Sequence, residues 1–172
     1  MAILATSPAF AADGCNLRLV ASVGMSTDSE GGTDVPMTIA GKPVNLLIDT
    51  GGVDSMLTQN TVSTLGLFSD RLGGYLLMYG RKKIDHYASA RDVVFGGLTA
   101  PRMRFLVMPD GVMPPELGGT LAPDVLRAYD DDFDFANAKF NLVSPNHCPG
   151  QVVYWTKEPY AQIALDLDPW AM

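Results

Sequence analysis

The chain has 172 residues, 47% of them hydrophobic and 18% charged, which suits one domain with a substantial core and excludes a disordered chain. Its formal net charge is −7 and it has no extended basic run, which argues against nucleic acid as a partner. The 17 glycines and 12 prolines predict many turns, as in a β-rich protein rather than a helix bundle.

The first residues resemble the end of an export signal. Residues 1–11 are mostly small and apolar, and Ala9-Phe10-Ala11 has the small-x-small form of a cleavage site, although no Lys or Arg precedes it. Either the numbered chain begins inside a longer signal or the similarity is accidental. The first alternative predicts a periplasmic or secreted protein. No apolar run reaches the ~18 residues that a membrane span needs.

Two cysteines, Cys15 and Cys148, lie far apart in the sequence, which excludes a compact metal-binding motif. In an oxidising compartment a disulfide between them would tie the mature N-terminus to the end of the domain. The loop-entropy argument gives a bridge of this length an upper value of roughly 4–5 kcal/mol. The alternative is a pair of unpaired, buried thiols.

Strand patterns dominate the rest of the chain. In chain order, we predict strands over 16–23, 35–39, 43–48, 88–95 and 103–108, with tight turns at 40–42 and 96–97 and loops over 26–34 and 110–119. Short helices are predicted over 60–65, ended by Gly66, and over 123–129. A hairpin is predicted from 132–135 and 139–143, and the runs 152–155 and 162–167 are strand-like. We therefore assign 1–11 to a signal remnant, 12–150 to one domain and 151–172 to a C-terminal strand segment that would suit the lead-in to a missing second half.

The stretch 44–52 is the most informative, because an apolar strand ends there in an acid, a hydroxyl and two glycines: Asp49, Thr50, Gly51 and Gly52. The glycines allow a sharp turn and a close backbone approach. Taken alone, the tripeptide fits an Asx or Ser/Thr turn at a strand end equally well. A lone carboxylate is also a poor peptidase, whereas two carboxylates that share a proton act as general base and general acid.

The surroundings favour the chemical interpretation, because here the chain resembles the bacterial retropepsin-like aspartic proteases. The matching motifs are the hairpin at 39–43, the Asp-Thr-Gly strand at 47–52, a Ser-containing strand at 55–57, Leu-Gly-Leu at 65–67, and the runs 118–126 and 129–142. The run 147–155 is similar to an exported proteobacterial subgroup. Together the matches span about residues 33–167 and are more specific jointly than singly.

The resemblance implies a mainly β fold, half of an acid-protease barrel with one or two short helices, and an aspartic endopeptidase that cleaves extended peptides. It makes Asp49 the catalytic acid, Thr50 a hydroxyl that braces the two half-sites, and Gly51 a backbone carbonyl facing the substrate. Gly52 stands where the family usually has Ala, which we expect to widen the floor of the substrate cleft. Because there is one Asp-Thr-Gly, the resemblance implies a homodimer or a second half-site in a longer chain.

The hairpin that closes over substrate in this family, the flap, is expected between residues 72 and 89. Gly73, Gly74 and Gly80 would supply mobility, and Leu76, Met78 and Tyr79 would supply apolar contact. Met78, Tyr79 and Gly80 are the predicted substrate contacts of the flap. The match here is one of position and not of motif.

Ala122 is a departure, because the family favours Gly in the loop that packs under the catalytic turn. A methyl group there is expected to push the Asp49 loop or to force φ out of the glycine region. The alternative function is therefore a catalytically inactive domain that binds a peptide or protein, and a third is a structural envelope domain with an accidental Asp-Thr-Gly.

No cofactor or metal is expected. The acidic run 130–134 lacks the glycine and distal glutamate of a calcium loop, and a turn entering an edge strand explains it. His86 and His147 have no second histidine at metal-ligand spacing. The sequence contains neither a serine nucleophile elbow nor a phosphate-binding loop.

Overall fold

The computed structural model describes residues 18–77 and 82–145. All of them belong to one unit, Leu17–Pro145. Several sequence predictions lie outside the described residues: the signal remnant, the pairing of Cys15 with Cys148, the substrate contacts Met78, Tyr79 and Gly80, and the segment 151–172.

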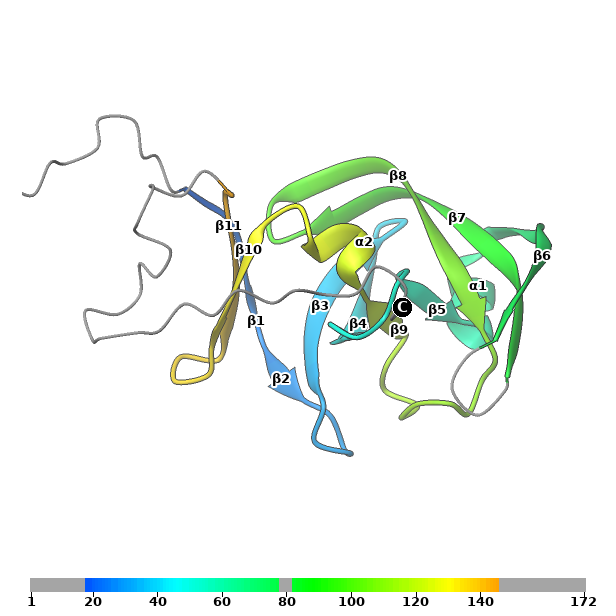
Figure 1. The fold of residues 1–172 in the computed structure, drawn as a ribbon, viewed down its shortest axis with the longest axis horizontal. Coiled ribbons are helices and arrows are strands. Elements are labelled where there is room, and N and C mark those ends of the chain that lie inside the picture. The colour runs from blue at the N-terminus through cyan, green and yellow to red at the C-terminus, as the bar shows by residue number, and fades with distance from the viewer. Residues whose placement is uncertain (1–17, 78–81, 146–172) are drawn as a thin grey trace, which may run out of the picture. The chain divides into compact units, whose positions relative to one another are not determined.

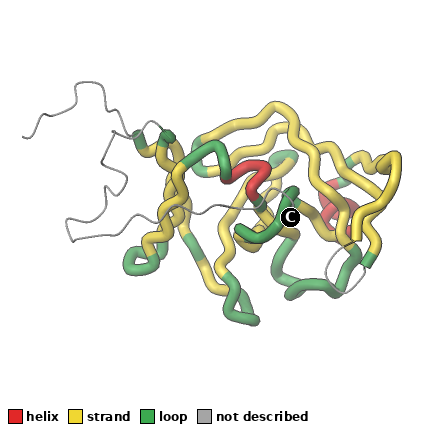
Figure 2. Tube along the Cα trace, in the orientation of Figure 1, coloured by secondary structure: helices red, strands yellow, loops and turns green. Residues whose placement is uncertain are grey.

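Eleven strands and two short helices make up the described residues, as Figure 2 shows by colour. In chain order they are β1 (Leu19–Gly24), β2 (Ser26–Thr27), β3 (Thr33–Ile39), β4 (Lys42–Ile48), β5 (Met56–Thr58), α1 (Gln59–Leu65), β6 (Phe68–Leu77), β7 (Lys83–Phe95), β8 (Leu98–Met108), β9 (Gly119–Leu121), α2 (Pro123–Leu126), β10 (Asp130–Asp134) and β11 (Lys139–Val143).

The larger sheet closes into a barrel (Figure 1). Its strand order is β2-β3-β4-β9-β5-β8-β7-β6, and a further pairing of β3 with β7, Thr38 opposite Val94, joins six of these strands in a ring. A three-stranded sheet of order β1-β11-β10 makes up the rest. The prediction of a mainly β, retropepsin-like closed barrel with short helices is confirmed.

The β3–β4 hairpin leads directly to the Asp-Thr-Gly turn. Along β3 the buried positions Val35, Met37 and Ile39 alternate with more exposed residues, which is the period of a half-buried strand. Ala40 and Gly41 have φ of 50° and 76°, the left-handed values that a two-residue hairpin turn requires. The predicted turn at 40–42 is therefore confirmed.

Both helices begin where they were predicted, but the second ends earlier. Thr58 caps α1 by accepting from the Thr61 backbone N–H, and Gly66 ends it in the left-handed conformation, with φ of 67°. The helix α2 stops at Leu126 instead of Tyr129, because the Tyr129 backbone N–H donates to the Leu126 carbonyl in a turn. That turn delivers the chain into β10.

Strand lengths were underestimated. β7 has 13 residues and β8 has 11, whereas the sequence predicted only their apolar ends. Polar residues such as Arg102, which pairs with Arg91, belong to the strands beyond the predicted ends. Their sequence has no apolar alternation that would predict a strand. β2 and the start of β3 also occupy part of the predicted loop 26–34.

The short strand β9 was predicted as the end of a loop. It is a strand because β4 pairs with it in parallel on one side and β5 pairs with it antiparallel on the other. Gly119 allows this contact, since a Cβ atom there would collide with the Met56 backbone carbonyl. This pairing places the β9–α2 junction beside the end of β4.

The core joins the barrel to the three-stranded sheet. Phe140 of β11 is fully buried, 6.2 Å from the ring of Phe95 and 4.9 Å from that of Phe133, measured between centroids. The other largest fully buried side chains include Phe105, Ile39, Leu46, Leu57, Ile84, Met108, Leu121, Leu126 and Leu142. No helix of the described ranges is long and apolar enough to cross a membrane.

The acidic run forms β10, an edge strand of the three-stranded sheet, as the sequence suggested. Surrounding protein atoms partly desolvate the Asp131 carboxyl, and the adjacent Asp130 repels its charge, which together raise the pKa of Asp131 to about 6. A carboxyl whose pKa is raised in the folded state favours folding below its ordinary value of 3.8 and loses that contribution as the pH rises to about 6.

We therefore expect Asp131→Asn to raise the urea midpoint of unfolding near neutral pH and to leave it unchanged in strong acid, where both side chains are neutral. Asp92→Asn, which also removes a negative charge from an exposed strand position, is the matched control. An equal gain at both pH values, or the same gain in the control, would contradict the assignment.

Candidate active site

Asp49 follows directly after β4, and three backbone hydrogen bonds define its position. Its N–H donates to the Leu121 carbonyl of β9 (2.9 Å), so the end of β4 is joined to the end of β9. The Gly52 N–H donates to the Asp49 carbonyl (3.2 Å) and closes the turn. The Gly51 N–H donates to the carboxylate Oδ1 (3.2 Å) and orients the side chain. The turn expected from Asp-Thr-Gly-Gly is thus present.

Ser55 and Asp124 brace the turn from the other side. The Ser55 hydroxyl donates to Asp124 Oδ1 (2.7 Å), and the Ser55 N–H donates to the same oxygen (3.0 Å). The Ser55 hydroxyl in turn accepts from the Ala122 N–H (3.0 Å). Ser55 is fully buried. These hydrogen bonds join Ser55, which follows the Asp49 turn, to Ala122 and Asp124 at the start of α2.

Ala122 does not adopt the backbone conformation that we expected to be strained. It is fully buried with φ of −121° and ψ of 175°, an extended conformation open to any residue, so the position has no need of glycine. The expectation that Ala122 forces φ out of the glycine region is wrong, because the residue caps α2 from a β conformation.

Gly52 does not leave an open space in the floor. A Cβ atom on Gly52 would lie 2.8 Å from Asp49 Oδ2 and 3.3 Å from the Ala122 methyl carbon. The volume that a side chain would take is already shared by the carboxylate and that methyl group. The role of Gly52 in binding substrate stays a prediction.

The remaining residues of the turn face outward. Thr50 and Gly51 are exposed, and Val53 is 79% exposed, an unusual state for a valine beside a candidate active site. Nothing within the described unit covers them, which leaves the proposed bracing role of Thr50 to a second half-site.

A groove of about 260 Å³ runs between the end of this turn and the β6–β7 hairpin, lined by Asp54, Leu72, Leu76, Tyr87, Arg104, Phe105 and Leu106. The Arg104 guanidinium stacks over the Tyr87 ring, 4.6 Å from its centroid. Leu72 and Leu76 belong to the hairpin expected as the flap, and the hairpin itself is confirmed as β6 and β7. Its predicted contact residues Met78, Tyr79 and Gly80 lie outside the described residues.

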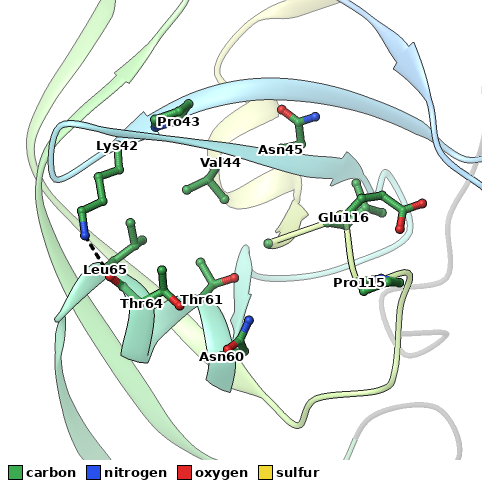
Figure 3. A pocket seen from close by; sticks show the side chains of 12 residues that line it. Lys42, Pro43, Val44, Asn45, Asn60, Thr61, Thr64, Leu65, Pro115 and Glu116 are labelled. Atoms are coloured by element: carbon green, nitrogen blue, oxygen red, sulfur yellow. Dashed lines mark hydrogen bonds between the residues drawn. The ribbon is translucent and has the colours of Figure 1, made fainter.

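A larger cavity of about 380 Å³ lies away from the turn (Figure 3). It is bounded by β4, α1 and residues 115–118, and the Lys42 Nζ donates to the Thr64 carbonyl across its rim (2.9 Å). None of residues 49–54 lines it, whereas Asp54 lines the smaller groove, so we do not assign the larger cavity to the candidate active site.

Sequence reasoning missed three residues around the site. Ser55 and Asp124 stand in motifs that carry the family resemblance, and that was the signal that could have identified them. Thr120 of β9 lies in the run 118–126, which carries the resemblance as well. It is 7% exposed, and its Oγ1 is the only buried side-chain oxygen or nitrogen without a hydrogen-bond partner in residues 18–77 and 82–145. Thr120 pairs with Leu47, which lies two residues before Asp49, so Thr120 lies beside the C-terminal end of β4.

No group of three His, Cys, Asp or Glu side chains in the described ranges is arranged to hold a metal ion. The polar groups that the structure places around the turn are a carboxylate, backbone amides and the Ser55 hydroxyl.

The barrel and its strand-end aspartate define a class, the retropepsin-like half-barrel with one Asp-Thr-Gly turn. Residues 35–121 match the family described as aspartyl protease. The chain belongs to the aspartyl protease family.

The chain is similar to several solved structures at low sequence identity. A retropepsin-like aspartic protease from Rickettsia conorii is 17% identical with a TM-score of 0.51, over 75% of this chain and 93% of that one. EIAV protease in complex with the inhibitor HBY-793 is 22% identical, with a TM-score of 0.45, over 59% and 91%. The retroviral protease-like domain of Ddi1 from Leishmania major is 18% identical, with a TM-score of 0.42, over 67% and 96%.

Curated proteins gave no match. The Rickettsia structure supports the fold alone, and the narrower resemblance to exported proteobacterial members stays a prediction.

Ser55→Ala tests the bracing network. The substitution leaves the Ala122 N–H without its acceptor and removes one of the two hydrogen bonds that Asp124 Oδ1 accepts, so we expect the free energy of unfolding to fall by about 1–3 kcal/mol. Ser63→Ala is the control, because the exposed Ser63 hydroxyl bonds only to its own helix at the Gln59 carbonyl. Urea unfolding checks both. Equal losses in the two variants would show that the network contributes nothing special.

Proposed function

We propose that the chain is an aspartic endopeptidase that cleaves extended peptides with one Asp49 from each of two half-sites. The observation that carries the proposal is the geometry of the turn. Asp49 ends a barrel strand, its backbone is bonded to β9, its carboxylate accepts from Gly51, and an apolar groove begins a few residues away. Rigid support of a reactive carboxylate at the edge of a groove is what amide hydrolysis requires.

The proposed mechanism needs two carboxylates at close range. Like charges about 3 Å apart cannot both ionise, so the pair holds one proton and titrates as a unit. The ionised member takes a proton from water as it attacks the peptide carbonyl, and the protonated member supports the carbonyl oxygen and later protonates the leaving nitrogen. The Gly51 N–H bond to Oδ1 keeps one carboxylate oxygen oriented while the other changes its proton.

The second carboxylate comes from another copy of the chain in this proposal. The exposed turn supports this, because Thr50 and the 79% exposed Val53 would be covered when two turns meet across a twofold axis. A second half-site within a longer chain would serve the same chemistry. The export-like segment 1–11 supports a periplasmic or secreted site of action.

The substrate is proposed to lie as a strand between the turn and β6. β6 stands last in the order of the large sheet, so its outer edge is free to pair with a peptide backbone. The side chains near it are apolar and exposed, with Tyr75 at 62%, Leu76 at 48% and Leu77 at 61%. We therefore expect a preference for peptides with apolar side chains.

Asp49→Asn tests the chemistry. The amide cannot share or transfer the proton, so we expect cleavage of a peptide library to be lost by at least about 10³-fold, while the unfolding curve stays unchanged. Asp92→Asn is the matched acid-to-amide control, because Asp92 has φ of 52°, which Asn adopts readily, and lies on the exposed part of β7. Undiminished cleavage by the Asp49 variant would remove the enzymatic assignment and leave the peptide-binding alternative.

Mixing wild-type protein with Asp49→Asn tests the second half-site. In a random mixture of equal parts, only about a quarter of the dimers carry two aspartates, so activity falls below the half expected from dilution. Sedimentation over the same concentrations must show dimers. Activity that stays at half, in a protein that sediments as a monomer, would contradict a shared site.

A further inference from the structure

We propose that Gly52 and Ala122 are positioning residues that form a size-matched pair beside the Asp49 carboxylate. A methyl group on Gly52 would crowd both the Asp49 carboxylate and the Ala122 methyl group. The consequence for catalysis rests on the proposed function, whereas the packing does not.

A side chain at position 52 would be crowded by the groups around it. A Cβ atom on Gly52 would lie 2.8 Å from Asp49 Oδ2, 3.1 Å from Asp49 Cγ and 3.3 Å from Ala122 Cβ. Contacts under 3.0 Å between carbon and oxygen are repulsive, so one of the partners has to move. At the neighbouring Gly51 the nearest atom to such a Cβ is Asp49 Oδ1 at 3.7 Å, an ordinary contact. The crowding is specific to position 52.

The backbone of Ala122 is held in place by burial and hydrogen bonds. Ala122 is fully buried, its N–H donates to the Ser55 hydroxyl (3.0 Å), and its carbonyl accepts from Val125 (3.0 Å) and Leu126 (3.2 Å) in the first turn of α2. The Gly52 backbone is held by its own bond to the Asp49 carbonyl. Among the described residues the Asp49 carboxylate is held by a single 3.2 Å bond from the Gly51 N–H, so a methyl group at 52 displaces the carboxylate rather than Ala122.

The arrangement of Gly52 and Ala122 departs from the family pattern. The resemblance places Ala at the position of Gly52 and Gly at the position of Ala122, and this chain has the opposite arrangement. Moving the single methyl group from one side of the contact to the other keeps its volume beside the carboxylate. Ala122 is therefore half of a compensated exchange and not a lesion that inactivates the site.

The test is a double-mutant cycle on the full chain with Gly52→Ala, Ala122→Gly and the double variant. We expect Gly52→Ala to shift the Asp49 ¹³Cγ resonance and to lower kcat by about ten- to a hundredfold with little change in KM, because the reacting group is misplaced while the peptide groove is intact. The double variant should recover most of both. Gly24→Ala, at a position with no atom within 4 Å of the added Cβ, should change neither.

The Asp49 ¹³Cγ resonance distinguishes failure of the Gly52–Ala122 pairing from failure of the proposed protease function. If the wild type cleaves no peptide, the proposed function fails, and the resonance cycle still decides the pairing. If the wild type cleaves but the effects of the two substitutions simply add, the pairing is overturned and the protease assignment stands. Should Gly52→Ala fail to fold, a folded double variant supports the pairing and an unfolded one overturns it.

Discussion

The rest of the site depends on the hydrogen bonds that join the Asp49 turn, residues 49–52, and the Ser55 segment after it to β9 and α2. Asp49 is held by the Leu121 carbonyl on one side, and Ser55 is held by Asp124 and Ala122 on the other. The five residues between Asp49 and Ser55 are anchored at both ends, so the carboxylate direction is set by the barrel and not by the turn alone. Buried polar groups of this kind are costly to break, because each lost partner leaves an unsatisfied group.

The same anchoring explains how a sequence departure can be harmless. Ala122 departs from the family pattern, yet it lies in extended backbone and packs where Gly52 leaves room. In the proposed pairing, the methyl group of Ala122 and the missing methyl group of Gly52 offset one another in volume.

The half-site is electrostatically incomplete as it stands. In residues 18–77 and 82–145 the Asp49 carboxylate has no hydrogen bond to a second carboxyl group, and the proposed mechanism needs one. The exposed Thr50 and Val53 and the unpaired edge of β6 lie on elements next to it. Chemistry, assembly and substrate binding are therefore proposed to use neighbouring surfaces of the same barrel.

The sequence by itself determined the β3–β4 hairpin, the Asp49 turn and the end of α1 at Gly66, because these depend on local signals: a period-2 pattern and glycines at turns. The class of fold was predicted from several motifs taken together. Only the tertiary structure decided that 119–121 is a strand, that β7 and β8 run far beyond their apolar ends, and that Ser55 meets Asp124. These features depend on partners distant in the chain. The Ser55–Asp124 bond spans 69 residues, and no local pattern encodes a contact whose energy comes from excluding water between segments that far apart.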